Sequence, residues 1–207
     1  MVYDGEVGKM LYLLEHQALK KYKYAYKDLS LIGYSRSVCP QCSRQIGIPQ
    51  YSGNIPHLIL EGGNEWPDYL QFCGAGKRLF LISERALEIF EKNIITGYDG
   101  YQSVDCESII RNRDIKKNPN YYSLNVSGRI DLDFASMHLK KKHFCPQCRQ
   151  YEWNRNRLEP FILDCATWDG SDVCLIDSLP GFRVCSGNLM QVIHNNHLKG
   201  FSFRASR

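Results

Sequence analysis

The chain has 207 residues, of which 43% are hydrophobic and 23% charged, and its formal net charge is +4. This composition is that of a globular domain, and no apolar run reaches the roughly 18 residues of a membrane-spanning helix. The N-terminus lacks a basic stretch followed by an apolar stretch and a small-residue cleavage site, so we expect a cytoplasmic protein with no membrane partner. Nine cysteines, an odd number, favour reduced thiols and metal binding over a disulfide framework.

The first part of the chain predicts short strands separated by loops. Periodicity does not decide between a strand and a helix for residues 9–15, and we favour a strand. Residues 58–60 are also expected to be extended. The glycine-rich stretch 62–76 predicts a loop. In the basic stretch 20–27, lysines alternate with tyrosines, which is typical of a solvated edge strand or helix. Nucleic-acid binding by stacking and phosphate neutralisation is the alternative interpretation of that stretch.

A strand-helix-strand unit is predicted around residues 79–98. The apolar residues 79–82 suit a strand, and Ser83 stands where a helix N-cap accepts an orphan backbone amide. Gly97 is expected to end the helix in a left-handed conformation. The apolar stripe of the helix is expected to consist of Leu87, Phe90 and Ile94.

A second unit of the same kind is predicted near the C-terminus. Ser186 and Gly200 follow Ser83 and Gly97 at the same offset of 103 positions, and residues 182–185 supply the strand. The stripe of the second helix is expected to consist of Leu189, Met190 and Ile193. A repeat of this length indicates two related units, because solenoid repeats recur every 20–50 residues or so. We therefore predict one α+β domain over residues 1–207, with a pseudo-repeat at about 36–105 and 142–204.

The segment between the two predicted units is more polar than the units themselves. Residues 99–127 are polar and are expected to be partly irregular, with a turn at 116–120. Alternation of Ile130, Leu132 and Phe134 with polar residues predicts a half-buried strand. The turn Asp169–Asp172 leads into a strand at 173–176; it lacks the twelve-residue spacing and terminal glutamate of a calcium loop, so we interpret it as a plain turn.

The motif with the most specific chemistry occurs twice, as Cys39-Pro40-Gln41-Cys42 and Cys145-Pro146-Gln147-Cys148. Each C-P-x-C knuckle presents two thiolates on one tight turn, and a tetrahedral Zn²⁺ takes two such knuckles. The knuckles lie 106 positions apart, whereas a simple zinc ribbon has about 15–20 residues between its pairs. One structural Zn²⁺ held by Cys39, Cys42, Cys145 and Cys148 would therefore join the two halves of the chain.

Other residues could enter this site or act elsewhere. His57, His138 and His143 lie near the knuckles and are alternative ligands. A redox-active dithiol is a further alternative, although a duplicated pair is unexpected for one. The remaining cysteines are expected to be small core residues: Cys73, Cys106, Cys165, Cys174 and Cys185. No P-loop, metalloprotease helix or nucleophile elbow is present, so we do not expect an enzyme.

The two knuckles, the unit between them, the turn Trp168–Val173 and the segment Phe182–Phe203 resemble the bacterial double-CXXCG motif proteins over residues 36–204. The glycine that follows the second cysteine in that family is Ser43 in one knuckle and Arg149 in the other. That glycine normally relieves a strained backbone position.

Members of that family are encoded as immunity proteins, which bind a co-inherited antibacterial toxin. The resemblance implies neutralisation of a cognate secreted toxin domain by steric occlusion, and it specifies neither the toxin's chemistry nor the contact surface. Exposed aromatic residues are the candidates for that contact, namely Trp66, Tyr69, Tyr101, Tyr121 and Tyr122. A zinc-ribbon protein that binds nucleic acid is the alternative; the modest charge makes a nucleic-acid partner the less expected one.

Overall fold

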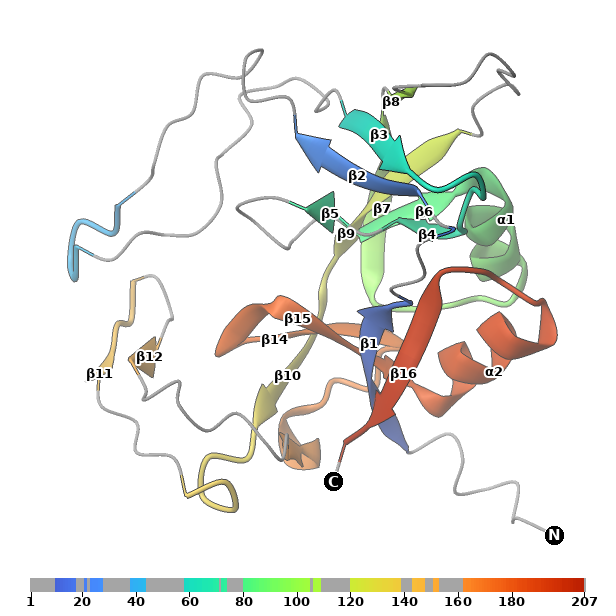
Figure 1. Ribbon diagram of the computed structural model, residues 1–207. Coiled ribbons are helices and arrows are strands. Elements are labelled where there is room, and N and C mark those ends of the chain that lie inside the picture. Colours follow the sequence, from blue (N-terminus) through green and yellow to red (C-terminus); the bar gives the residue numbers. More distant parts are fainter. Residues whose placement is uncertain are drawn as a thin grey trace, which may run out of the picture.

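The computed structural model describes residues 10–17, 21, 23–27, 38–43, 58–70, 72–73, 80–104, 106–108, 120–138, 143–147, 151–152 and 162–206. In this part of the chain, short strands dominate and two α-helices lie on the same side of them (Figure 1). The mixed α+β class predicted from the sequence is confirmed. The first helix, α1, spans Glu84–Lys92 and the second, α2, spans Gly187–Asn195. A short 3₁₀ helix covers Cys165–Thr167.

The strands form four sheets. The largest has, in spatial order, β13 (Leu163–Asp164), β10 (Gly128–Leu132), β14 (Val173–Ile176), β15 (Leu179–Ser186), β1 (Leu11–His16) and β16 (Phe201–Ala205). The second has β4 (Tyr69–Leu70), β6 (Phe80–Ser83), β9 (Tyr121–Val126) and β7 (Tyr98–Val104). The third has β5 (Phe72–Cys73), β2 (Lys23–Lys27), β3 (Leu58–Gly62) and β8 (Cys106–Ser108). The last pairs β11 (His143–Phe144) with β12 (Tyr151–Glu152).

Both predicted strand-helix-strand units are present, as β6-α1-β7 and β15-α2-β16. The predicted N-caps are confirmed: the Ser83 hydroxyl accepts a hydrogen bond from the Ala86 backbone N–H at 3.1 Å, and Ser186 does the same for Leu189 at 3.1 Å. Each cap satisfies an amide that the first helical turn would otherwise leave without a partner. The serine therefore sets where each helix begins.

Each unit takes its middle strand from the other half of the chain. Strand β1 lies between β15 and β16, with Leu11 opposite Ser186. In the same way β9 lies between β6 and β7, with Tyr121 opposite Ser83. The correspondence continues outward, because β2 runs parallel to β5 and antiparallel to β3, as β10 does to β14 and β13. The recurrence of elements thus starts at β1 and β9, upstream of the boundaries at 36 and 142.

Two buried aspartates connect the two units by hydrogen bonds. Asp68 precedes β4 and accepts hydrogen bonds from the Ser83 hydroxyl at 2.7 Å and from the Lys199 backbone N–H at 2.7 Å. Asp172 precedes β14 and accepts from the Ser186 hydroxyl at 2.6 Å and from the Thr96 backbone N–H at 3.0 Å. Each carboxylate therefore joins the helix cap of its own unit to the loop that follows the helix of the other unit.

The helix C-termini differ from the sequence prediction. Asn93 and Asn196 cap the helices, and the left-handed residues just beyond them are Ile94 (φ 54°) and His197 (φ 51°). Ile94 is consequently 81% exposed and not part of the apolar stripe; Ile95 is buried in its place.

Gly97 and Gly200 serve a different purpose from the predicted helix termination. Both are left-handed, with φ of 97° and 92°, but they lie at the start of the next strand. A Cβ atom on Gly97 would lie 2.1 Å from the Val173 carbonyl oxygen, and one on Gly200 would lie 2.5 Å from that of Tyr69. Glycine is therefore required at both positions by the close approach of the two units.

One apolar core is shared by the two units. It contains Phe80 and Phe90 from the first unit and Leu189 and Phe201 from the second, all buried. Arg183 of β15 is also buried, and its guanidinium carbon lies 5.3 Å from the centre of the Phe80 ring. Because both helices cover the same core, the units pack as one body.

Some sequence predictions were wrong in detail. The loop expected at 62–76 contains β4 and β5. The segment 99–127, expected to be partly irregular, contains most of β7 and all of β8 and β9, and β8 and β9 were not predicted. Strand β2 pairs with β3 on one side and β5 on the other, so the stretch 20–27 does not provide an edge strand. These strands are short or polar, and pairing with distant residues determines them more than their local pattern does. The strand predicted at 9–15 and the alternating strand near 130 are confirmed as β1 and β10.

Candidate metal centre

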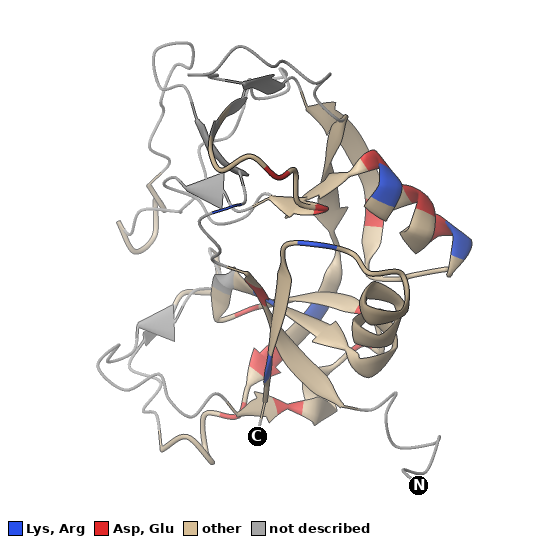
Figure 2. Cartoon of the chain, turned by 45° about the vertical axis from the view of Figure 1, so that its right-hand side comes forward, with Lys and Arg blue, Asp and Glu red and all other residues tan. Residues whose placement is uncertain are grey.

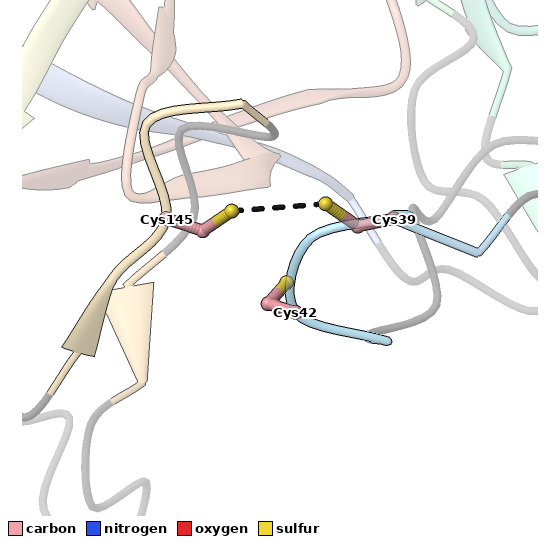
Figure 3. Close-up of side chains that lie close together, drawn as sticks. All are labelled: Cys39, Cys42 and Cys145. Carbon is pink, nitrogen blue, oxygen red and sulfur yellow. Dashed lines mark hydrogen bonds between the residues drawn. The ribbon is translucent and has the colours of Figure 1, made fainter.

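Three of the four predicted ligand cysteines lie together. The thiol sulfurs of Cys39, Cys42 and Cys145 are all within 4.8 Å of one another, and Cys39 Sγ is 3.7 Å from Cys145 Sγ (Figure 3). Cys39 and Cys145 are buried, and Cys42 is partly so. Cys148 and Arg149 lie outside the described residues, as does the predicted turn at 116–120 except for residue 120. The residues that the structure does describe contain no other comparable group of three His, Cys, Asp or Glu donors.

The sulfur separations suit a tetrahedral metal better than a disulfide. With Zn–S bonds of about 2.3 Å, the edge of a ZnS₄ tetrahedron is about 3.8 Å. The 3.7 Å between Cys39 Sγ and Cys145 Sγ is close to that edge. A disulfide bond would require about 2.05 Å. The donor set therefore fits Zn²⁺, which prefers thiolates, and a fourth thiolate would close the coordination sphere.

The knuckles occupy equivalent places in the two halves. The first, with its turn at 40–42, lies in the connection between β2 and β3. The second follows β11, in the connection between β10 and β13. In Figure 1 the turn of the first knuckle and the hairpin β11-β12 lie on the same side of the molecule, away from α1 and α2. A metal here would join the connection between β2 and β3 to the connection between β10 and β13.

The first knuckle has a tight local geometry. The Ser43 backbone N–H donates to the Cys39 carbonyl at 2.8 Å, and Ser43 is left-handed with φ of 54°. This is the position at which the resembling family has glycine. The side-chain amide of Gln41 lies 3.7 Å from Cys145 Sγ, so a residue of one knuckle also contacts a sulfur of the other.

Replacing Ser43 by glycine should stabilise the protein. A residue with a side chain in the left-handed region costs about 1–2 kcal/mol, part of which glycine loses again through its greater freedom in the unfolded chain. We expect a net gain of about 0.5–1 kcal/mol and a melting temperature higher by roughly 1–4 °C, measured by calorimetry with zinc present. Ser43→Ala, which keeps the strain, should give no gain; equal stabilisation by both variants would contradict the argument.

The other cysteines divide between core and surface. Cys174 and Cys185 are buried, as expected, and burial raises the pKa of both thiols, that of Cys174 to about 12. Neither thiol belongs to the sulfur cluster. Cys165 is exposed, so its assignment to the core was wrong. The side chains of Cys73 and Cys106 lie outside the described residues.

Of the three alternative ligands, only the side chain of His138 is described, and the turn at 169–172 is held by hydrogen bonds of Asp169. His138 is exposed and is not in the sulfur cluster, while His57 and the His143 side chain lie outside the described residues. The Asp169 carboxylate accepts from the backbone N–H groups of Arg129 at 2.8 Å and Ser171 at 2.9 Å. Its oxygens therefore hold the turn against β10, which is a structural role for the carboxylate.

The aromatic residues predicted for partner contact do not all reach the surface. Tyr69 and Tyr121 belong to the core, with the Tyr121 hydroxyl donating to the Pro67 carbonyl at 2.8 Å. Trp66 and Tyr122 are half-buried and Tyr101 is 45% exposed. Periodicity could not separate these cases, because it does not reveal which face of a short strand a partner strand will cover.

The structural role of Asp68 and Asp172 was missed in the sequence. Each stands 15 or 14 positions before the capping serine to which it is hydrogen-bonded. An aspartate at nearly the same distance before each capping serine was the signal that the sequence offered.

No family model matches the chain, and no curated protein is detectably similar to it. The resemblance to the double-CXXCG motif proteins therefore remains a prediction based on the cysteine pattern. Within the described residues, neither helix has the length and apolar character needed to cross a membrane.

Proposed function

We propose that this protein is an immunity protein that binds a cognate antibacterial toxin domain and neutralises it by covering its substrate or target site. The observation that carries the proposal is the meeting of Cys39, Cys42 and Cys145, three thiols from knuckles 106 positions apart. This arrangement is expected for a metal that fixes a rigid binding body. It matches the cysteine pattern on which the family resemblance rests.

The metal in this proposal is one structural Zn²⁺ with Cys148 as the fourth thiolate beside Cys39, Cys42 and Cys145. Four protein ligands leave no position for a water molecule, so the ion supplies folding energy and not a nucleophile. We further propose that the chain consists of two related lobes joined by this ion. The equivalent positions of the knuckles in the two halves support that view.

A non-enzymatic, cytoplasmic protein fits this function. The buried thiols outside the cluster are held protonated by burial, which makes them unsuitable as nucleophiles. Steric neutralisation needs only a stable body and a complementary surface, both of which a shared core with a metal at its connections provides.

The alternative, a zinc-ribbon protein that binds nucleic acid, has less support. Its best candidate segment, β2, pairs with a strand on each side. The exposed residues of α1 include Glu84, Glu88 and Glu91, whose charge repels phosphates.

Co-expression tests the proposal directly. The toxin domain encoded next to this gene should arrest growth when produced alone, and growth should return when this protein is co-expressed. The two should co-purify as a complex whose affinity falls far less steeply with salt than that of a nucleic-acid complex. Rescue without a detectable complex would indicate enzymatic reversal of the damage, and failure of both rescue and complex formation would refute the function.

A further inference from the structure

One side of α1 carries a row of carboxylates that lies against tyrosines of the neighbouring sheet. Glu84, Glu88 and Glu91 are spaced by four and three positions, which places them on one side of the helix, and all three are exposed. We call these glutamates, with Tyr98 and Tyr101 of β7 and Tyr122 of β9, the carboxylate-tyrosine face. Figure 2 shows acidic residues along α1, with a basic residue near each end of the helix.

One phenol of this face contacts a carboxylate directly. The Tyr122 hydroxyl donates to Glu84 Oε1 at 3.3 Å. The charge of Glu91 raises the pKa of Tyr101, and burial together with Glu84 raises the pKa of Tyr122. The phenols are therefore neutral at physiological pH and add no charge of their own to the face.

The second unit of the chain serves as an internal control for this face. The strand registers make Tyr12 and Phe203 the counterparts of Tyr122 and Tyr101. The two aromatic pairs have the same edge-to-face arrangement, with centroids 6.5 Å apart for Tyr12–Phe203 and 5.4 Å apart for Tyr101–Tyr122. The aromatic pair is therefore a feature of the fold itself.

The carboxylates do not recur in the second unit. From the matching caps Ser83 and Ser186, the counterparts of Glu84, Glu88 and Glu91 on α2 are Gly187, Gln191 and His194. A role in folding common to both units would require acidic residues in both. Their presence on α1 alone points to a task that only the first unit performs.

The surroundings leave this face open to a partner. Strand β7 is the edge of its sheet, and Tyr101 and Asp99 on it are exposed. Of the two basic residues of α1, Arg85 is held by Asp68 at 3.0 Å and by the Asn196 carbonyl at 2.6 Å. Lys92 lies at the end of the helix, one turn beyond Glu88. The face is thus acidic on a chain whose net charge is +4.

We propose that the carboxylate-tyrosine face is the surface that binds the toxin, and that the toxin presents a lysine- or arginine-rich surface to it. This inference rests on the proposed immunity function. A lysine or arginine side chain can form a salt bridge with a carboxylate and at the same time lie over the face of a neighbouring aromatic ring. Tyrosines, which lose little conformational freedom on binding, supply the contact area at the centre. Charge complementarity of this kind raises the association rate constant more than it lowers the dissociation rate constant.

The test compares two triple variants with the same change in net charge. Glu84→Gln, Glu88→Gln and Glu91→Gln together remove the charge of the face. The control combines Glu15→Gln, Glu65→Gln and Asp177→Asn, which are carboxylates of surface ion pairs elsewhere on the chain. Association and dissociation rates with the purified toxin domain encoded next to this gene are measured by surface plasmon resonance across a salt series.

Removal of the face's charge should slow association on the order of 10-fold at low salt and flatten its salt dependence, whereas the control should change the association rate less than about 2-fold. Tyr101→Ala should mainly accelerate dissociation. Equal effects of the two triple variants, or no effect of either, would overturn the assignment of this surface. The immunity function would still stand, because the wild-type complex had formed. Self-association of the wild-type protein that the first triple variant abolishes would also overturn it. Absence of any complex with the wild-type protein would refute the immunity function instead.

Discussion

Replacing Cys145 by serine should lower the melting temperature of the zinc-loaded protein by on the order of 10 °C or more. Cys145 is buried, and its sulfur lies 3.7 Å from that of Cys39 in the other half of the chain. Loss of this ligand removes several kcal/mol of metal-binding energy that contributes to folding only when both knuckles are assembled. Calorimetry should be combined with elemental analysis, in which we expect about one zinc per wild-type chain and substoichiometric zinc in the variant.

Cys165→Ser is the matched control, because Cys165 is exposed and is not in the sulfur cluster. Its zinc content and melting temperature should equal those of the wild type. Chelation of zinc from the wild-type protein should reproduce the Cys145→Ser defect and leave the Cys145→Ser variant little changed. Equal melting temperatures for the two serine variants, or two zinc ions per wild-type chain, would refute a single shared site.

Replacing Asp172 by alanine should destabilise the protein by about 2–4 kcal/mol, since each buried donor left without a partner costs about 1–3 kcal/mol. The Ser186 hydroxyl, the Asn188 side chain and the Thr96 backbone N–H all donate to this buried carboxylate. The N-cap of α2 and the loop after α1 would lose their common anchor. The melting temperature should fall by roughly 5–15 °C, measured by circular dichroism.

Asp177→Ala provides the comparison for this variant. Asp177 forms a surface ion pair with Arg129 at 3.4 Å, which contributes little, so its loss should shift the melting temperature by no more than about 2 °C. Asp68→Ala should resemble Asp172→Ala, because Asp68 fastens the other unit in the same way. An Asp172→Ala variant as stable as Asp177→Ala would mean that the packing of the two units against each other does not depend on the hydrogen bonds of these carboxylates.

Local signals in the sequence identified the helices and their starts. A serine that caps a helix and an apolar stripe at helical spacing act within one or two turns, so Ser83 and Ser186 were found without knowledge of the fold. The duplicated knuckle was equally local, since two cysteines on one turn are already placed for a metal. For these features the residues that matter are neighbours in the chain, and pattern alone was sufficient.

Where an element ends, and what it touches, depended on distant residues. Gly97 was expected to end a helix, but its actual constraint is the carbonyl of Val173 in the other unit. Strand β9 lies in a stretch too polar to predict a strand, yet pairing with β6 and β7 makes it an inner strand of its sheet. The burial of Tyr69 and Tyr121 follows from the same long-range pairing.

The sequence by itself determined the two capped helices, the strands with clear alternation and the paired thiols of the first knuckle, and it predicted that Cys39 and Cys145 would meet. The tertiary structure decided the placement of β1 between β15 and β16 and of β9 between β6 and β7, and the reciprocal bonds of Asp68 and Asp172. The physical reason is that a strand's alternation specifies which face is buried but not which strand will pair with it. Partner choice is set by the packing of the whole core, in which residues more than a hundred positions apart become neighbours.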